Sequence, residues 1–189
     1  MPDTHVYVRD TEQERRFENL FNAFCADITA YCGWKASSTN DAQDAVAEVF
    51  LTAWRRLDEL PDGDAARVWL YATARRVIAN QRRSRRRRLA LHERLTLEAT
   101  VRRPEAAGDD DQTLVHEALR RLRPSDREAL LLAEWEGLSP AEIAEVVGCL
   151  TVTARGRLHR ARRRFQVVFE ELQARPDLPT AHYVAQPLP

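Results

Sequence analysis

The sequence predicts an all-α fold made of two small helical domains that a flexible linker joins. Apolar residues recur at helical spacing through most of the chain. This pattern loosens near the middle, where Pro104, Gly108 and the acidic run 109–111 stand together. With 189 residues, 44% of them hydrophobic, the chain has enough apolar side chains for two small cores. The predicted divisions are a mobile N-terminal arm (1–10), a first domain (11–94), an acidic linker (95–112), a second domain (113–174) and a Pro-rich disordered tail (175–189).

Composition narrows the class of protein. The 29 basic residues, 28 of them Arg, balance 29 acidic ones, so any attraction to nucleic acid must come from locally sorted charge. No apolar run approaches the length of a membrane span and no signal pattern opens the chain, so we expect a cytoplasmic protein. The three Cys lack C-x-x-C spacing and the five His are dispersed. We therefore expect reduced thiols, no metal, no cofactor and no catalytic site.

The first domain should begin with a helix. Thr11 followed by Glu14 is a capping-box signature. A stripe at helical spacing follows: Phe17, Leu20, Phe21, Phe24, Ile28 and Tyr31. The stretch 32–39 contains Gly33 and two Ser and indicates a loop.

A second helix is predicted from an Asn40 or Asp41 N-cap to about Leu60. Its core stripe is Ala42, Ala45, Val46, Val49, Ala53, Leu57 and Leu60. The other face sets an exposed apolar residue among charged ones: Asp44, Glu48, Leu51, Arg55 and Asp58. Phe50 and Trp54 lie at its boundary. That mixture suits docking against a basic partner helix, and a solvated face with one stray Leu is an equally weighted alternative.

A tight turn at Pro61–Asp64 leads into a basic helix that runs to Arg88. Between residues 65 and 88 it holds nine Arg and no acid. One side is a core stripe of Leu70, Ala74, Val77, Ile78 and Gln81. The opposite side gathers Trp69, Arg76, Asn80 and Arg83, which suit a nucleic-acid strand with unstacked bases. The alternative is a solvated basic helix whose Trp lies half in the core.

The second domain should hold four helices. The first, with Leu114, Ala118, Leu119 and Leu122, stops at Pro124; the next is capped by Ser125 with Glu128 and ends at Gly137. Ser139, Pro140 and Glu142 start a third helix that Gly148 ends. A last helix runs from about Thr151 to Gln173. Short helices joined by a glycine turn, the second of them strongly basic, form a helix-turn-helix.

The last helix has one face suited to DNA. Ala154, Leu158, Ala161, Phe165 and Val168 make its core stripe. Val152, Gly156, His159, Arg160 and Arg163 point the opposite way, with Arg155 on the flank. This face could enter a major groove while the flanks meet phosphate. Gly156 would either permit close approach to DNA or reflect drift at a tolerant position.

Four stretches carry a resemblance to a known family: FENLFNAF (17–24), DAQDAVAEVFLTAWRRL (41–57), RVWLYATARRVIANQRR (67–83), and the run from LRPSDREALLLAEWEGLSPAEIAEVVG to RLHRARRRF (122–165). The chain resembles a bacterial RNA polymerase sigma factor of the sigma-70 superfamily, in its extracytoplasmic-function (group IV) form. The resemblance implies a region 2-like helical bundle and a region 4-like helix-turn-helix.

The resemblance also implies partners and sites for a sigma factor that directs promoter-specific initiation. Core RNA polymerase would be contacted through its β′ clamp helices and β flap, the first by Asp44, Glu48, Leu51 and Trp54. Melted −10 DNA would meet Asp62, Gly63, Asp64, Arg67, Trp69, Arg76, Asn80 and Arg83. The −35 duplex would meet Arg155, Gly156, His159, Arg160 and Arg163. An anti-sigma factor is a further candidate partner.

Two other classes compete with this interpretation. A stand-alone helix-turn-helix regulator would not need the exposed face around Asp44, Glu48 and Leu51. A nucleic-acid-processing enzyme should show a carboxylate cluster or metal triad within a basic cleft, and the sequence contains no such pattern.

Overall fold

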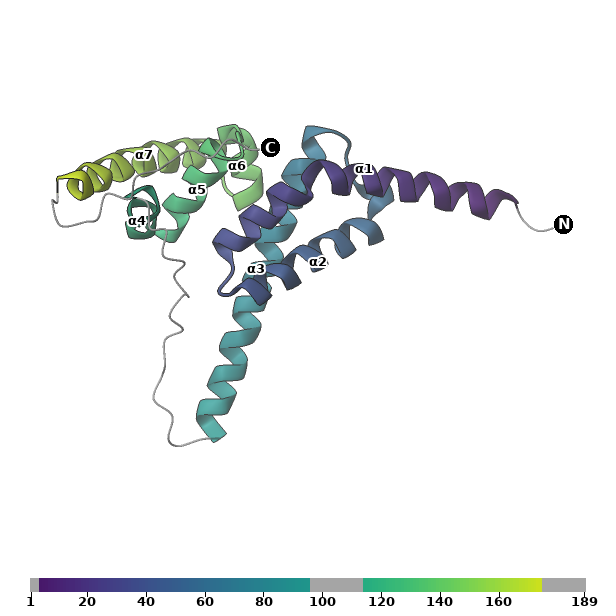
Figure 1. Ribbon diagram of the computed structural model, residues 1–189, viewed down its shortest axis with the longest axis horizontal. Coiled ribbons are helices and arrows are strands. Elements are labelled where there is room, and N and C mark those ends of the chain that lie inside the picture. The colour runs from purple at the N-terminus through teal and green to yellow at the C-terminus, as the bar shows by residue number, and fades with distance from the viewer. Residues whose placement is uncertain (1–3, 96–113, 175–189) are drawn as a thin grey trace, which may run out of the picture. The chain divides into compact units, whose positions relative to one another are not determined.

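The structure is a computed structural model that describes residues 4–95 and 114–174. Within these ranges every regular element is a helix, which confirms the predicted all-α class (Figure 1). Helices α1 to α3 form one compact unit, and α4, α5, the first part of α6 and α7 form a second. The predicted tail lies outside the described residues, and so does the predicted linker, apart from its first residue at the end of α3.

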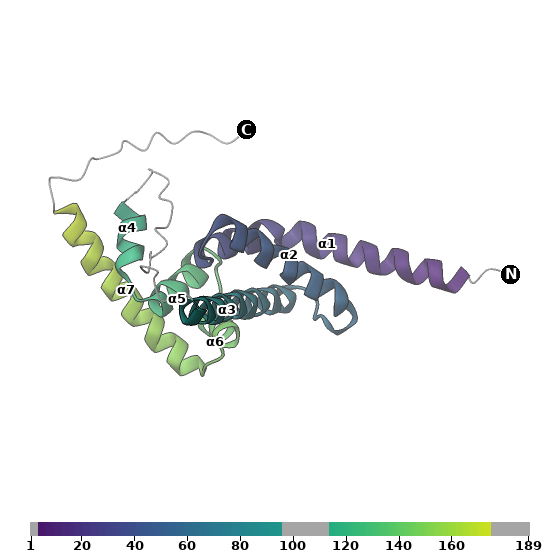
Figure 2. The ribbon, with the colours of Figure 1, turned by 90° about the horizontal axis from the view of Figure 1, so that it is seen from below.

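The first unit is a three-helix arrangement. It contains α1 (Thr4–Lys35), α2 (Thr39–Arg55), a short 3-10 helix η1 (Leu57–Glu59) and α3 (Asp64–Leu95). Each of α1, α2 and α3 packs on the other two, and Figure 2 shows them side by side. Ile28, Val49 and Leu70, one from each helix, have no exposed surface or almost none. Burying such side chains stabilises the unit by about 1.5 to 3 kcal/mol each.

Helix α1 is longer than predicted at both ends. It begins at Thr4, not after a Thr11 cap, so it includes most of the predicted arm. Residues 4–10 contain neither Gly nor Pro, so nothing in them interrupts a helix. At the other end α1 runs through Gly33 to Lys35, because a single Gly costs a helix only about 1 kcal/mol.

Helix α2 differs from the prediction at both ends. Its N-cap is Ser38, whose Oγ accepts from the Asp41 backbone N–H at 3.1 Å, so neither Asn40 nor Asp41 is the cap. The helix ends at Arg55, well before Leu60. Leu60 has extended backbone (φ −71°, ψ 130°) because it precedes Pro61, whose ring disfavours helical geometry there.

The aromatic stripe of α1 is only partly internal. Tyr31 is buried and its ring meets that of Tyr71 edge-on at 5.3 Å. Phe17, Leu20 and Phe24 are half-buried, and Phe21 is exposed. The stripe is therefore buried at its C-terminal end and opens to the surface at its N-terminal end.

Cys32 provides a simple test of this core. Its side chain is buried, and desolvation raises the pKa of the thiol to about 11. Because the thiolate is the nucleophile, Cys32 should resist alkylation by iodoacetamide at pH 8 in the native protein. The half-buried Cys25 and Cys149 should react first, and mass spectrometry of the labelled peptides would show the order. Labelling of Cys32 as fast as Cys25 would contradict the packing described here.

The second unit contains α4 (Leu114–Arg121), α5 (Pro124–Glu134), α7 (Thr151–Gln173) and residues 140–144 of α6 (Pro140–Val147). Helix α7 packs on both α4 and α5. Their shared core consists of Leu119, Leu122, Leu130, Leu158 and Ala161, with Phe165 and Val115 packed against it. The predicted span of α7 is confirmed, and so is its buried stripe at Ala154, Leu158 and Ala161.

Local signals fix most of the turns in this unit. The capping box before α6 is confirmed: Ser139 N–H donates to Glu142 Oε2 at 2.7 Å, and Glu142 N–H donates to Ser139 Oγ at 3.3 Å. Gly148 ends α6 with φ +71°, a conformation that favours glycine. The predicted Ser125 cap is wrong, because α5 begins one residue earlier with Pro124, where the fixed φ of proline suits a first helical turn.

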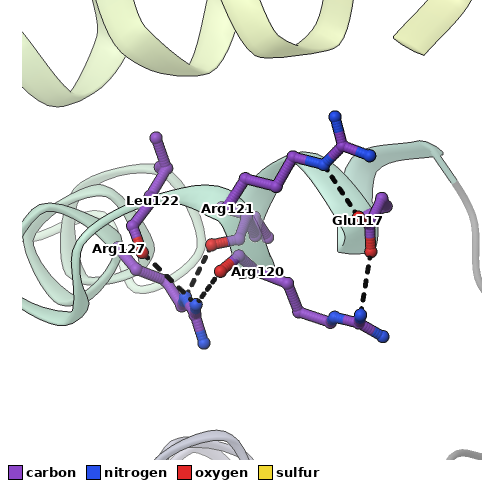
Figure 3. Close-up of polar contacts among 6 residues, drawn as sticks. Glu117, Arg120, Arg121, Leu122 and Arg127 are labelled. Carbon is purple, nitrogen blue, oxygen red and sulfur yellow. Dashed lines mark hydrogen bonds and ion pairs between the residues drawn. The ribbon is translucent and has the colours of Figure 1, made fainter.

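Arg127 closes the end of α4. Its Nε donates to the Leu119 carbonyl at 2.6 Å, and its Nη2 donates to the carbonyls of Arg120 at 2.5 Å and Leu122 at 3.4 Å. Figure 3 shows the guanidinium aimed at the last two of these groups, while Glu117 pairs separately with Arg120 and Arg121. Partial burial, and secondarily the charge of Arg120, lower the pKa of Arg127 from its ordinary value. One side chain thus donates to three carbonyls at the end of a short helix, and the Leu119 carbonyl also accepts from the Leu122 backbone N–H at 3.2 Å.

Arg127→Ala should therefore loosen the second unit. Hydrogen bonds to a charged group contribute about 1.5 to 3 kcal/mol, and the half-exposed position favours the lower end of that range. Urea denaturation would measure the loss, and faster amide exchange in α4 would locate it. Arg123→Ala, at an exposed position in the same turn, is the matched control and should change little. Equal stability of the two variants would contradict the capping role.

Candidate functional site

The outer side of α2 gathers the residues predicted to dock. Asp44, Glu48, Leu51 and Trp54 are all exposed, Leu51 by 41% and Trp54 by 42%, and we call these four the docking face. The buried side of α2 consists of Ala42, Ala45, Val49, Phe50 and Ala53. The structure therefore brings the four predicted residues together on one surface and separates them from the core.

Helix α1 enlarges this surface with aromatic residues. Phe17 meets Trp54 edge-on at 5.2 Å, and Phe21 meets Phe50 edge-on at 4.8 Å. Phe21 is 38% exposed, so the apolar surface continues from α2 onto α1. The sequence placed both Phe residues on one stripe at helical spacing, and such a stripe does not reveal how much of each side chain the partner helix covers.

The turn between η1 and α3 is held by α1. Arg16 Nη2 donates to the Leu60 carbonyl at 2.8 Å and to Asp62 Oδ1 at 2.9 Å. Gly63 has φ +61°, and Asp64 begins α3, where a negative charge suits the helix dipole. Asp62, Gly63 and Asp64 are exposed and stand directly before the basic helix.

The predicted strand-binding side of α3 is a continuous surface. Arg76, Asn80 and Arg83 are exposed and Trp69 is half-buried, and we call these four the strand face. Arg76 lies back along its own helix, with Nε donating to the Ala72 carbonyl at 3.1 Å. Arg83 donates to Asn80 Oδ1, which fixes the orientation of that amide. The surface combines an indole, an amide and two guanidinium groups, as base stacking, base-edge hydrogen bonding and phosphate binding require.

Arg67 does not join the strand face. It lies two residues before Trp69, about 200° around the helix, and its side chain is half-buried. The buried sides of α3 include Val68, Tyr71 and Thr73 as well as part of the predicted stripe, because this part of the helix packs on both α1 and α2. Of that stripe, Leu70, Ala74 and Ile78 are buried, and Val77 and Gln81 are half-buried.

Helix α7 presents the predicted duplex-reading residues. Arg155, His159, Arg160 and Arg163 are exposed, on the side away from the buried Ala154, Leu158 and Ala161. Gly156 is half-buried, and a Cβ there would meet only the flexible end of Arg160, 3.3 Å away. The fold of this unit therefore does not itself demand glycine, and both explanations of Gly156 stay open.

The start of α7 holds two exposed apolar residues. Val152, which the sequence placed on the side suited to DNA, is 71% exposed, and Leu150, which sequence reasoning left out, is 73% exposed. Apolar side chains at the entry to a major groove can contact thymine methyl groups. The position of Leu150 off the core stripe, directly before the helix, was the signal that could have found it.

Two arginines of α7 serve the fold. Arg162 Nη2 lies 2.7 Å from Glu134 Oε1, and Arg164 pairs with Asp126, whose side chain is only 6% exposed. Both acids belong to α5, so these pairs fix the rotation of α7 about its axis. Of the six arginines between residues 151 and 164, these two therefore help to orient the side of α7 that carries the exposed ones.

Two kinds of site are absent from the described part of the chain. No group of three or more His, Cys, Asp or Glu residues there could hold a metal ion. No helix there combines the length and apolar character needed to cross a membrane.

Comparison with known proteins covers both units. Residues 20–88 match the protein family described as Sigma-70 region 2, and residues 112–165 match Sigma-70, region 4. The ECF RNA polymerase sigma factor SigL of Mycobacterium tuberculosis is 29% identical over 160 residues, covering 81% of this chain and 88% of that protein. SigC of the same species, another ECF RNA polymerase sigma factor, is 35% identical over 156 residues, covering 78% of this chain and 80% of that protein.

A solved structure agrees with these relatives. The co-crystal structure of the sigma factor RpoE with the anti-sigma factor NepR, from Bartonella quintana, contains a chain that matches with a TM-score of 0.66 at 26% identity. The match covers 82% of this chain and 96% of that chain. From the two matched regions and the extent of the SigC similarity, we conclude that the chain belongs to the ECF RNA polymerase sigma factors of the sigma-70 family.

Proposed function

We propose that the chain binds core RNA polymerase and directs promoter-specific initiation through three separate surfaces. The docking face binds the β′ clamp helices, the strand face holds the melted non-template strand of the −10 element, and α7 reads the −35 duplex. The observation that carries this proposal is that all three surfaces occur on one short chain. Each surface lies on a side of its helix that differs from the buried side. The protein would act in the cytoplasm and would catalyse no reaction itself.

The docking face favours this function over a stand-alone regulator. Leu51 and Trp54 expose apolar surface beside Asp44 and Glu48. Such an exposed apolar surface is typical of a site that binds a partner protein. A basic partner helix would supply both apolar contact and opposite charge. A regulator that needs only DNA has no use for this combination.

A second polymerase contact is proposed on the second unit. Leu122, Val167 and Val168 line a groove bordered by four arginines, Arg121, Arg123, Arg163 and Arg164. We assign this groove to the β flap. An anti-sigma factor that covered the docking face would hold the chain inactive, and the exposed Phe21 extends the apolar surface that it could cover.

Run-off transcription with purified core polymerase on a promoter library tests the proposal. Initiation at a defined set of promoters, only when the chain is present, is the expected result. A protein that binds duplex DNA tightly by itself and leaves the specificity of polymerase unchanged would instead be a stand-alone regulator.

A further inference from the structure

Helix α1 contacts the stretch that leads into α3 at two neighbouring points. Gln13 Nε2 donates to the two carboxylate oxygens of Asp58, in η1, at 3.2 and 3.4 Å. Gln13 and Arg16 are three residues apart, so they lie on one side of α1. The bonds from Arg16 to the Leu60 carbonyl and to the Asp62 carboxylate continue the same line of contact into the turn. One side of α1 therefore holds both η1 and the turn after it.

The arginine next to Arg16 serves no such purpose. Arg15 pairs with Glu12 of its own helix, and 67% of its side chain is exposed, compared with 36% for Arg16. The hydrogen bond from Arg16 to the Leu60 carbonyl is partly buried, so water screens it less than it screens a surface pair. Of these two adjacent arginines, only Arg16 has its side chain committed to the turn.

The turn presents two carboxylates with different surroundings. Asp62 and Asp64 are exposed on either side of Gly63. Carboxylates repel phosphates, but they accept hydrogen bonds from the amino groups of bases. Asp62 already pairs with Arg16, whereas no cation in the described part of the chain pairs with Asp64. Asp64 can therefore accept from a base, while the fold already uses Asp62.

On the basis of the proposed function, we propose that Arg16 is a positioning residue for base recognition at the −10 element. It contacts no DNA itself. It fixes the Leu60 carbonyl and the Asp62 carboxylate, and these set the course of the chain into Asp64. Asp64 is five residues before Trp69, or about 8 Å along α3, so one opened strand can reach both side chains.

The test uses holoenzyme assembled from core polymerase and the full chain, on two promoters that differ at a single −10 base. The measured quantity is the ratio of open complexes formed on the preferred and the altered promoter. Arg16→Ala should lower this ratio by about 3- to 10-fold, because a charged hydrogen bond at a partly exposed position is lost. Arg15→Ala removes the same charge from the adjacent residue and should keep the wild-type ratio. Arg16→Lys keeps the charge and a donor and should retain part of the ratio.

A double-mutant cycle separates positioning from direct reading of a base by Asp62. Asp62→Ala alone should lower the ratio by less than Arg16→Ala does, because the bond from Arg16 to the Leu60 carbonyl remains. In the Arg16→Ala background, Asp62→Ala should then change nothing further, since the two residues act through one contact. Fully additive losses would mean that Asp62 contacts the base itself, and the positioning role of Arg16 would be overturned.

The thermal midpoint and the affinity for core polymerase without DNA complete the test. Both should stay close to the wild type in every variant, because these side chains lie outside the docking face. An Arg16→Ala holoenzyme that opens both promoters less well in equal proportion, or opens both normally, would overturn the positioning role alone. Loss of the cooperative melt would also overturn it, since Arg16 would then serve the fold of the whole unit. If the wild-type chain forms no holoenzyme, the proposed function itself fails.

Discussion

Asp44→Arg combined with Leu51→Asp is expected to weaken binding to core polymerase by at least about 100-fold, equivalent to roughly 2.8 kcal/mol. Central interface residues often contribute 2 kcal/mol or more, and this pair changes both kinds of contact at once. The Arg would face a basic partner, and the Asp would put a charge where apolar contact is expected. A fluorescence-anisotropy titration with labelled protein would measure the affinity.

The fold should survive this double change because both side chains are exposed and the buried side of α2 is untouched. The thermal midpoint should therefore stay close to that of the wild type. Glu145→Gln changes the net charge by +1, as the double variant does, at an exposed position outside the docking face and the proposed β-flap groove, and this control should bind polymerase normally. Normal affinity in the double variant would remove the docking role, and a lost cooperative transition would show that the face is internal.

Trp69→Ala should lower the fraction of open complexes by about 10- to 100-fold while leaving duplex binding nearly unchanged. Stacking of a base on an aromatic side chain contributes about 1 to 3 kcal/mol, and this contact forms only after the strands part. A template already melted at the −10 element should restore much of the activity. Permanganate footprinting of opened thymines on duplex and bubble templates would measure both effects.

The half-burial of Trp69 makes a stability control necessary. If the indole were mainly a core anchor, its removal would cost about 3 to 5 kcal/mol and no bubble template would help. Trp69→Phe keeps an aromatic platform and should retain most of the opening activity. A fully stable Trp69→Ala protein that opens duplex promoters like the wild type would exclude strand capture by this helix.

Local sequence signals correctly predicted the ends of those helices whose limits are set by residues only a few positions away in the chain. The capping box at Ser139 and Glu142 and the glycine turn at Gly148 act over a few residues, so α6 and α7 have the expected limits. The start of α1 and the caps of α2 and α5 were misplaced because several nearby residues could serve. Ser38 caps α2 in place of Asn40 or Asp41, and α5 begins with Pro124 after an Arg123 N-cap, so Ser125 lies inside its first turn.

The functional surfaces were predictable to the extent that they depend on one helix. Periodicity alone separates Asp44, Glu48 and Leu51 from the core of α2, and the structure agrees. It could not reveal that Phe21 would be exposed, because that depends on how α1 packs against α2. Nor could it reveal that Arg162 and Arg164 pair with α5, since their partners are about 30 to 40 residues away in the chain.

Under the proposed function, the bridge from Arg16 to Leu60 and Asp62 affects the free energy of promoter opening. A flexible loop would lose conformational entropy when it bound DNA, and this loss would cost roughly 1 to 2 kcal/mol of binding free energy for each residue that became ordered. Here α1 has already fixed two of the residues that lead into α3 when the chain folds. The entropic cost is therefore met during folding, and more of the interaction energy with an opened strand remains available for separating the base pairs.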